Sequence, residues 1–269
     1  MTLLLAIVAG ALIGLSLGAL GGGGSILAVP VLVYALGQSP AQATTGSLVV
    51  VGVTSLIGAV AAYRAGHVLL ARGAGFGAVA LGGAVGGAKA SAHVPEPVLL
   101  ACFAALMLLV AAVMATRLVR NEDGNRRVTS DDPIIRFSPT FACQCPRALK
   151  VLITATVVGL LTGFLGVGGG FLVVPALLLA LALPMEYAAG TSLVVITMTS
   201  AVALAVRTGT GVSPDWWLVL VLTGASAAGA VAGARLAGRT DTRRLQAAFT
   251  VLVLAVALYT AVRAFPALF

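Results

Sequence analysis

Two glycine-rich segments are the places where this sequence is best suited to bind a ligand. The first is Gly21-Gly22-Gly23-Gly24, followed by Ser25, and the second is Gly166-Val167-Gly168-Gly169-Gly170. Each lies inside a long apolar block and is expected to break a helix there, with Ser25 at the N-cap of the second piece. The start of a helix presents N–H groups and the positive end of its dipole to an anion. We therefore predict a shared anion site, with tight helix packing by the glycines as the alternative.

Two clusters of small polar residues fall in equivalent places. Thr44-Thr45-Gly46-Ser47 follows a turn at Pro40, and Ala189-Gly190-Thr191-Ser192 follows a turn at Pro184. Hydroxyls at a helix start can cap the helix or donate hydrogen bonds to an oxyanion without placing a charge in a membrane. Further along the same blocks, Thr54, Ser55, Thr199 and Ser200 could line a polar path or bond only to backbone carbonyls. The predicted substrate-binding residues are Gly22, Gly23, Gly24, Ser25, Thr45, Ser47, Gly168, Gly169, Gly170, Thr191 and Ser192.

Groups for catalysis or metal binding do not gather in the sequence. The eight acidic residues fall at the ends of apolar blocks or in the polar segment 117–150, and His67 and His93 lie beside loops. Cys143 and Cys145 form a C-x-C without the further ligands that a metal site requires. We predict a protein that is not an enzyme and that has no catalytic residues, no metal and no other cofactor.

The composition places these segments in a membrane. Of 269 residues, 60% are hydrophobic and only 9% are charged, with a mean hydropathy of +1.10. Soluble domains carry about 25% charged residues, so a cytosolic enzyme, a secreted disulfide domain and a nucleic-acid binder are excluded. The net charge of +8 is better explained by basic loops on one side of a membrane.

Eight apolar blocks indicate membrane helices, and the first block of each half is too long for one of them. As one helix, residues 3–36 would span roughly 51 Å at 1.5 Å per residue, against a bilayer core of about 30 Å. The glycines therefore divide each long block, leaving the short pieces 25–36 and 171–183. The blocks are 3–36, 43–63, 73–92, 97–116, 151–183, 188–206, 216–234 and 245–262.

The chain repeats itself after 145 residues. That shift carries Gly18, Gly23, Gly24 and Pro30 onto Gly163, Gly168, Gly169 and Pro175, and a shift of 146 then matches Gly83 and Gly87 to Gly229 and Gly233. Internal repeats of this kind are typical of transporters. We predict an all-α integral membrane protein with two homologous halves of four to five helices and glycine-broken short helices near the midplane. The domains are 1–116, a cytoplasmic linker 117–150, and 151–269.

Loop charge favours inverted halves. If each half crosses five times, Lys89, Arg207 and Arg263 fall on one side and the other 13 of the 16 Lys and Arg residues on the other. Four crossings per half would give a weaker split of 11 to 5. Cytoplasmic loops are the basic ones, so both termini are predicted to lie outside. The overlapping G-x-x-x-G spacings in 82–87 predict close helix contact, with dimerisation as the alternative.

The residues resemble a known family. Gly166-x-Gly168-Gly169-Gly170-x-x-x-x-Pro175, more loosely repeated in 21–30 and followed by Ala-Ala-Gly-Thr-Ser-Leu at 188–193, is similar to the TauE/SafE family of sulfite and organosulfonate exporters. The resemblance covers both halves apart from the linker. It implies a multi-pass transporter of the bacterial or archaeal inner membrane for sulfite, thiosulfate or sulfonates. The first half departs from the pattern, with Thr45-Gly46-Ser47 where the second has Gly190-Thr191-Ser192.

These observations predict export of small sulfur-containing oxyanions by alternating access. The expected partners are the anion and the lipid bilayer, with no nucleic acid. The oligomeric state is left open, with a homodimer as one alternative. Two other functions would use the same residues differently: a channel-like anion pore, and a membrane scaffold protein that transports nothing.

Overall fold

The computed structural model describes residues 2–91, 94–120, 145–165, 170–181, 183–207, 214–237 and 240–264. The described part is helical throughout and contains no strand. Two helices extend into the predicted linker, since one ends at Arg120 and the next begins at Cys145; residues 121–144, Cys143 among them, lie outside the described residues. The helices are α1 (Thr2–Leu20), α2 (Gly23–Pro30), α3 (Pro40–Arg64), α4 (Leu70–Ser91), α5 (Glu96–Arg120), α6 (Cys145–Leu165), α7 (Gly170–Ala180), α8 (Met185–Arg207), α9 (Trp216–Ala237) and α10 (Thr242–Ala264).

The long first block is divided at the glycines, as predicted, and its second piece is not one regular helix. Gly21 has φ +71°, a left-handed conformation that glycine adopts at little cost. The chain then enters α2 and continues after Pro30 as a π-helical turn, η1 (Val31–Ala35). Pro30 has no N–H to give to the helix ladder, and wider turns of this kind accommodate such a defect.

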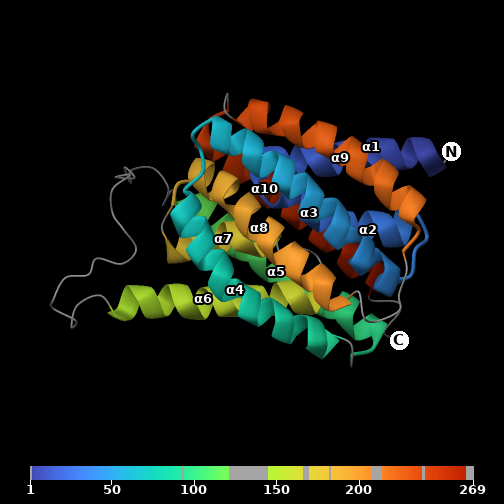
Figure 1. Cartoon of the computed structure of the whole chain (residues 1–269), viewed down its shortest axis with the longest axis horizontal. Coiled ribbons are helices and arrows are strands. Elements are labelled where there is room, and N and C mark those ends of the chain that lie inside the picture. Colours follow the sequence, from blue (N-terminus) through green and yellow to red (C-terminus); the bar gives the residue numbers. More distant parts are fainter. Residues whose placement is uncertain are drawn as a thin grey trace.

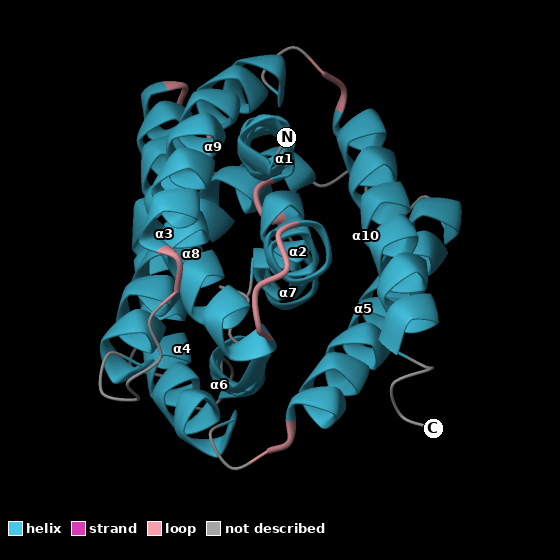
Figure 2. Ribbon diagram, turned by 90° about the vertical axis from the view of Figure 1, so that its right-hand side faces the viewer, coloured by secondary structure: helices cyan, strands magenta, loops and turns pink. Residues whose placement is uncertain are grey.

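Helices from the two halves pack in matching pairs. The most extensive contacts join α1 with α9 and α4 with α6, and each pair becomes the other when the halves are exchanged. The contacts of α3 with α8, of α5 with α10 and of α2 with α7 map onto themselves. Figure 2 shows α2 and α7 in the interior, between a wall containing α3, α4, α8 and α9 and a wall formed by α5 and α10.

Equivalent helices run in opposite directions. A methyl group on Gly52 of α3 would lie 3.3 Å from the Ser200 Cβ of α8, and one on Gly58 would lie 3.2 Å from a Leu193 methyl. Moving forward along α3 therefore means moving backward along α8, although the repeat places these helices in correspondence. Figure 1 shows α3 and α8 beside each other in the centre of the molecule. Opposite directions are what inverted halves with five helical passes require.

Glycines bring the paired helices into backbone contact. A Cβ at Gly83 or Gly87 of α4 would overlap the α6 backbone at Thr156 or Leu160, and Gly159 and Gly163 of α6 have the same relation to α4. On α9, Gly229 and Gly233 pack against α1 in the same way. The prediction of close helix contact is confirmed.

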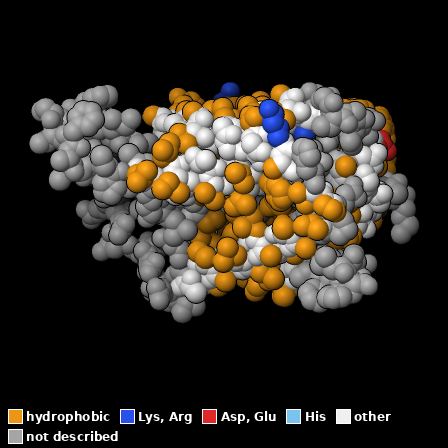
Figure 3. All heavy atoms as spheres, turned by 90° about the horizontal axis from the view of Figure 1, so that it is seen from below, with side chains coloured by type: hydrophobic (Ala, Val, Ile, Leu, Met, Phe, Trp, Pro, Cys, Tyr) orange, Lys and Arg blue, Asp and Glu red, His pale blue; other side chains and the backbone are white. Residues whose placement is uncertain are grey.

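The outer surface suits lipid. Leu3–Leu20, Pro40–Arg64, Tyr187–Arg207 and Trp216–Ala237 are long and apolar enough to cross a membrane, and Gly23–Ala35, Ala101–Thr116 and Val151–Leu165 are shorter apolar helices. Large apolar side chains are exposed along these helices, for example Leu4, Trp217 and Val251. Figure 3 shows such side chains spread over one face with few charges among them. Several apolar helices of spanning length with lipid-compatible side chains on the outside are what a multi-pass membrane protein requires.

Charged residues lie at the two ends of the bundle, unequally. Arg64 ends α3, Arg235 lies in the last turn of α9, and Arg243 and Arg244 lie in the first turn of α10; all four are exposed. The ends of α3 and α9 and the start of α10 line one pocket, which contains Ala62, Ala237 and Leu245, so the four arginines share one end. We call it the basic end. Lys89 and Arg207 lie in the last turns of α4 and α8, at the opposite end.

Candidate functional site

The two short helices start against each other. A methyl group at Gly22 would overlap the carbonyl group of Gly170, and one at Gly170 would lie 3.1 Å from the Gly22 Cα and 2.7 Å from the Ser25 Oγ. All three residues are buried. The start of α2, from the first half, therefore meets the start of α7, from the second, as the sequence predicted for a shared site. Gly168 and Gly169 lie outside the described residues.

Ser25 belongs to this contact but does not cap the helix. The N-cap of α2 is Gly22, so the prediction of a Ser25 cap is wrong. The fully buried Ser25 hydroxyl instead donates to the Gly22 carbonyl oxygen at 2.7 Å. The helix begins earlier than predicted because glycines can occupy its first turn when their backbones are packed closely.

The glycines of the first break face different neighbours. A methyl group at Gly24 would overlap the backbone of α1 at Ile13. At Gly23 it would meet the side chains of Leu252 and Leu20 at 2.9 and 3.1 Å. Gly23 thus faces α10 and α1, whereas Gly22 faces the partner break. Of the two, Gly22 has the position that the predicted site requires.

Ser192 connects the second half to the first break. Its hydroxyl is fully buried and lies 2.7 Å from both the Gly21 and the Ala189 carbonyl oxygens, to which it donates. A methyl group at Gly21 would overlap the Ala189 backbone. The hydroxyl therefore fixes the carbonyl at the point where the chain reverses. Among the predicted residues, Gly22, Ser25, Gly170 and Ser192 come together here with their neighbour Gly21.

The remaining predicted hydroxyls lie inside their helices, so of the two alternatives, capping the starts of α3 and α8 is excluded. The Ser39 hydroxyl accepts from the Gln42 N–H at 3.3 Å and caps α3. Thr45 and Ser47 donate backward to the carbonyls of Ala41 and Thr44, at 3.1 and 2.8 Å. On α8, which begins at Met185, Thr191 accepts a bond from the Leu69 N–H at 3.1 Å.

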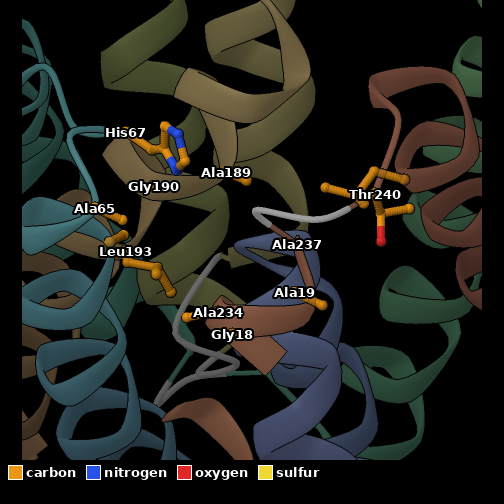
Figure 4. A pocket seen from close by; sticks show the side chains of 12 residues that line it. Gly18, Ala19, Ala65, His67, Ala189, Gly190, Leu193, Ala234, Ala237 and Thr240 are labelled. Atoms are coloured by element: carbon orange, nitrogen blue, oxygen red, sulfur yellow. The ribbon is translucent and has the colours of Figure 1, made fainter. Parts of the chain in front are cut away.

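A pocket opens beside the first break, at the basic end. Residues of α1, α3, α8, α9 and α10 line it. Figure 4 shows His67, Gly190 and Ala189 on one side and Ala19, Ala234 and Thr240 facing them. Ala189 contacts Gly21, and Ser192 lies one turn further along α8. The pocket therefore approaches the hydroxyl that holds the break.

Three buried hydroxyls at the crossing of α3 and α8 have no hydrogen-bond partner among the described residues. They belong to Thr54 and Ser55 of α3 and Ser200 of α8, and their exposure is 0%, 0% and 1%. Thr199 differs, since it donates to the Val195 and Ile196 carbonyls. A buried polar group without a partner costs roughly 1–3 kcal/mol, so these positions require a reason beyond packing.

The described side chains bring no three His, Cys, Asp or Glu residues together in a group that could hold a metal ion. The groups at the contact of α2 and α7 are instead backbone and hydroxyl groups, neutral donors and acceptors. Such a set is suited to binding a desolvated anion.

The fold defines a class: multi-pass membrane proteins with two oppositely oriented halves around a pair of short, broken helices, an arrangement that is common among transporters. The sequence model of the family described as "Sulfite exporter TauE/SafE" matches residues 6–260. The chain therefore belongs to the TauE/SafE family, as its motifs predicted.

Two proteins from Xylella fastidiosa are similar to the chain along its whole length. Both carry the name "Probable membrane transporter protein". The one from strain 9a5c is 31% identical over 270 residues, covering 99% of this chain and 98% of the relative. The one from strain Temecula1 / ATCC 700964 is 30% identical with the same coverage. No solved structure matches the chain.

Proposed function

We propose that this transporter exports small sulfur-containing oxyanions, such as sulfite, thiosulfate or organosulfonates, by alternating access. The observation that carries the proposal is the contact between the starts of α2 and α7, with Ser25 and Ser192 beside it. The family's description as a sulfite exporter supports this choice of substrate class.

The chemistry of this contact suits an oxyanion. The first N–H groups of a helix have no acceptor within the helix, and the dipoles of α2 and α7 add positive potential where their starts meet. Bonds from such donors to an anion are about twice as strong as neutral ones. The Ser25 and Ser192 hydroxyls now donate to carbonyls, and rotation about their Cβ–Oγ bonds would let them donate to a substrate.

The route is proposed from the arrangement of the halves. Inverted halves around a central site can expose that site first to one side and then to the other. The basic end is expected to be cytoplasmic, so the pocket at that end would admit the anion from the cytoplasm. Release would then follow the symmetry-related route on the other side.

Flux measurements with the purified protein in liposomes test the proposal. Sulfite, thiosulfate, sulfate and ethanesulfonate are supplied in turn, and we expect saturable uptake and counterflow for at least one sulfur anion. Flux without saturation or counterflow would indicate a channel-like pore instead. Folded protein that moves none of the four anions would contradict transport of this substrate class and favour a scaffold.

A further inference from the structure

A charged side chain lies among the helices at the end opposite the pocket. Arg207 donates from Nη1 to the Thr44 Oγ1 at 3.0 Å and from Nη2 to the Ser91 Oγ at 3.2 Å. These hydroxyls in turn donate to the backbone carbonyls of Ala41 and Ala88. The guanidinium thus ties the end of α8 to the start of α3 and to the end of α4 through neutral acceptors.

The repeat relates this cluster to the pocket at the basic end. The shift of 145 residues applies to α3 and α8, and the shift of 146 to α4 and α9. Under these shifts each member of the cluster corresponds to a residue that lines the pocket: Arg207 to Ala62, Thr44 to Ala189 and Ser91 to Ala237. One side of the molecule is therefore open between three alanines. At the equivalent place on the other side, an arginine and its two hydroxyl acceptors fill the space.

We propose that Arg207 is the oxyanion-recognition residue of a second mouth that mirrors the pocket. The inference rests on the proposed transport of oxyanions. Thr44 and Ser91 hold the guanidinium across the mouth, and an arriving anion replaces them as its acceptor. Because charge-assisted bonds are about twice as strong as neutral ones, a sulfite or sulfonate group competes well against two hydroxyl oxygens.

The residue type matters as much as the charge. A guanidinium presents several N–H groups in a planar fork that can bind two oxygens of one anion, or two separate hydroxyls, at the same time. A lysine ammonium carries the same charge without that geometry. The proposal therefore predicts a graded response to Lys and Gln at position 207.

Transport by Arg207→Gln and Arg207→Lys in liposomes tests the proposal, with labelled sulfite and ethanesulfonate as probes. We expect the half-saturating concentration to rise about 10- to 150-fold for Arg207→Gln, the loss expected for a bond to a charged ligand, and by less for Arg207→Lys. Thr116→Ala is the control, because it removes an exposed hydroxyl of α5 that belongs neither to the pocket lining nor to the Arg207 cluster and should leave transport unchanged.

The sign of the charge supplies a readout that a purely structural role would not move. In a background with Cys102, Cys143 and Cys145 replaced by Ser, Arg207→Cys is treated with 2-aminoethyl or 2-sulfonatoethyl methanethiosulfonate. We expect the cationic adduct to restore flux and the anionic adduct not to restore it.

The outcomes separate this inference from the proposed function. If the parent protein moves neither probe, oxyanion transport itself fails for these substrates, and the role of Arg207 fails with it. If the parent transports and Arg207→Gln and Arg207→Lys keep its half-saturating concentration, only the inference is overturned. If Arg207→Gln does not fold, Arg207→Lys decides by the same comparison. Equal rescue by both adducts would likewise overturn the inference.

Discussion

Ser192 is the side chain whose replacement tests the central site most directly. Its hydroxyl donates to the Gly21 carbonyl at 2.7 Å from a fully buried position. Loss of one hydrogen bond to a charged ligand costs about 1.5–3 kcal/mol, so Ser192→Ala should weaken anion binding roughly 10- to 150-fold. Stability should fall as well, by about 1–3 kcal/mol, because the buried Gly21 carbonyl loses this donor. Binding titrations and thermal unfolding in detergent measure the two effects.

Thr116→Ala is the control for Ser192→Ala. The Thr116 hydroxyl also donates to a carbonyl three residues earlier, that of Val113 at 2.9 Å, but it is exposed on α5. The Thr116→Ala variant should bind the anion as tightly as the parent protein does. Unchanged binding by Ser192→Ala as well would mean that this hydroxyl only fixes the break.

Thr54 gives a second prediction, with opposite signs for stability and function. Its hydroxyl is fully buried without a partner among the described residues. Thr54→Val keeps the shape of the side chain and removes the unpaired hydroxyl. It should therefore raise the free energy of unfolding by up to roughly 1–3 kcal/mol, which is measured as a higher melting temperature in detergent. If the hydroxyl meets the passing anion or its water, flux should fall. A stabilised variant with full flux would show that the hydroxyl has no part in transport.

The sequence predicts which residues form the site better than it predicts the hydrogen bonds that these residues make. The first glycine break is predicted correctly because four consecutive glycines interrupt an apolar block that is too long for one membrane-spanning helix. The cap predicted at Ser25 is misplaced because α2 starts before that residue, with Gly22 as its N-cap. The Ser39 cap could have been predicted from Ser39-Pro40 with Gln42 three residues after the serine, a capping-box pattern with proline at the first helical position. The unpaired hydroxyls of Thr54, Ser55 and Ser200 depend on how α3 and α8 cross, which spacing alone does not determine.

At the scale of helices, the contact between α4 and α6 depends on which face each glycine occupies. A methyl group at Gly87 would overlap the Leu160 carbonyl, whereas one at the adjacent Gly86 meets no atom within 4 Å. Gly87→Ala should therefore destabilise the protein by about 1–3 kcal/mol through overpacking. Gly86→Ala should be neutral or stabilising by up to about 1 kcal/mol, because alanine favours helix. Thermal unfolding of the two variants side by side measures the difference, and equal melting temperatures would contradict the packing seen here.

The sequence could predict this contact only in part. The G-x-x-x-G spacing in 82–87 indicated that α4 has a close neighbour, and the repeat indicated that α9 has one too. Neither observation identifies the partner helices, because the same glycine spacing can pack against any neighbouring helix. That α4 meets α6 and α9 meets α1 follows from the exchange between halves, a long-range feature of the whole bundle.

At the scale of the whole molecule, the two halves are related by a near-symmetry, but the two ends of the bundle differ in charge. The helix directions are opposite in equivalent helices, but the exposed arginines Arg64, Arg235, Arg243 and Arg244 gather at one end. Symmetry alone would let the bundle insert either way, and the charge difference selects one orientation. The same asymmetry leaves alanines around the pocket and places Arg207 at the opposite mouth.

Orientation in the membrane follows from this charge difference and can be measured at two exposed positions. Arg64 ends α3 at the basic end, and Asp215 precedes α9 at the opposite end. In a background without the native cysteines, a membrane-impermeant thiol reagent added to intact cells should label Asp215→Cys and leave Arg64→Cys unlabelled until the cells are opened. The reason is that basic segments remain in the cytoplasm during insertion. Labelling of both positions from the same side would contradict the five passes per half, and the reversed pattern would place the pocket outside and Arg207 at the cytoplasmic mouth.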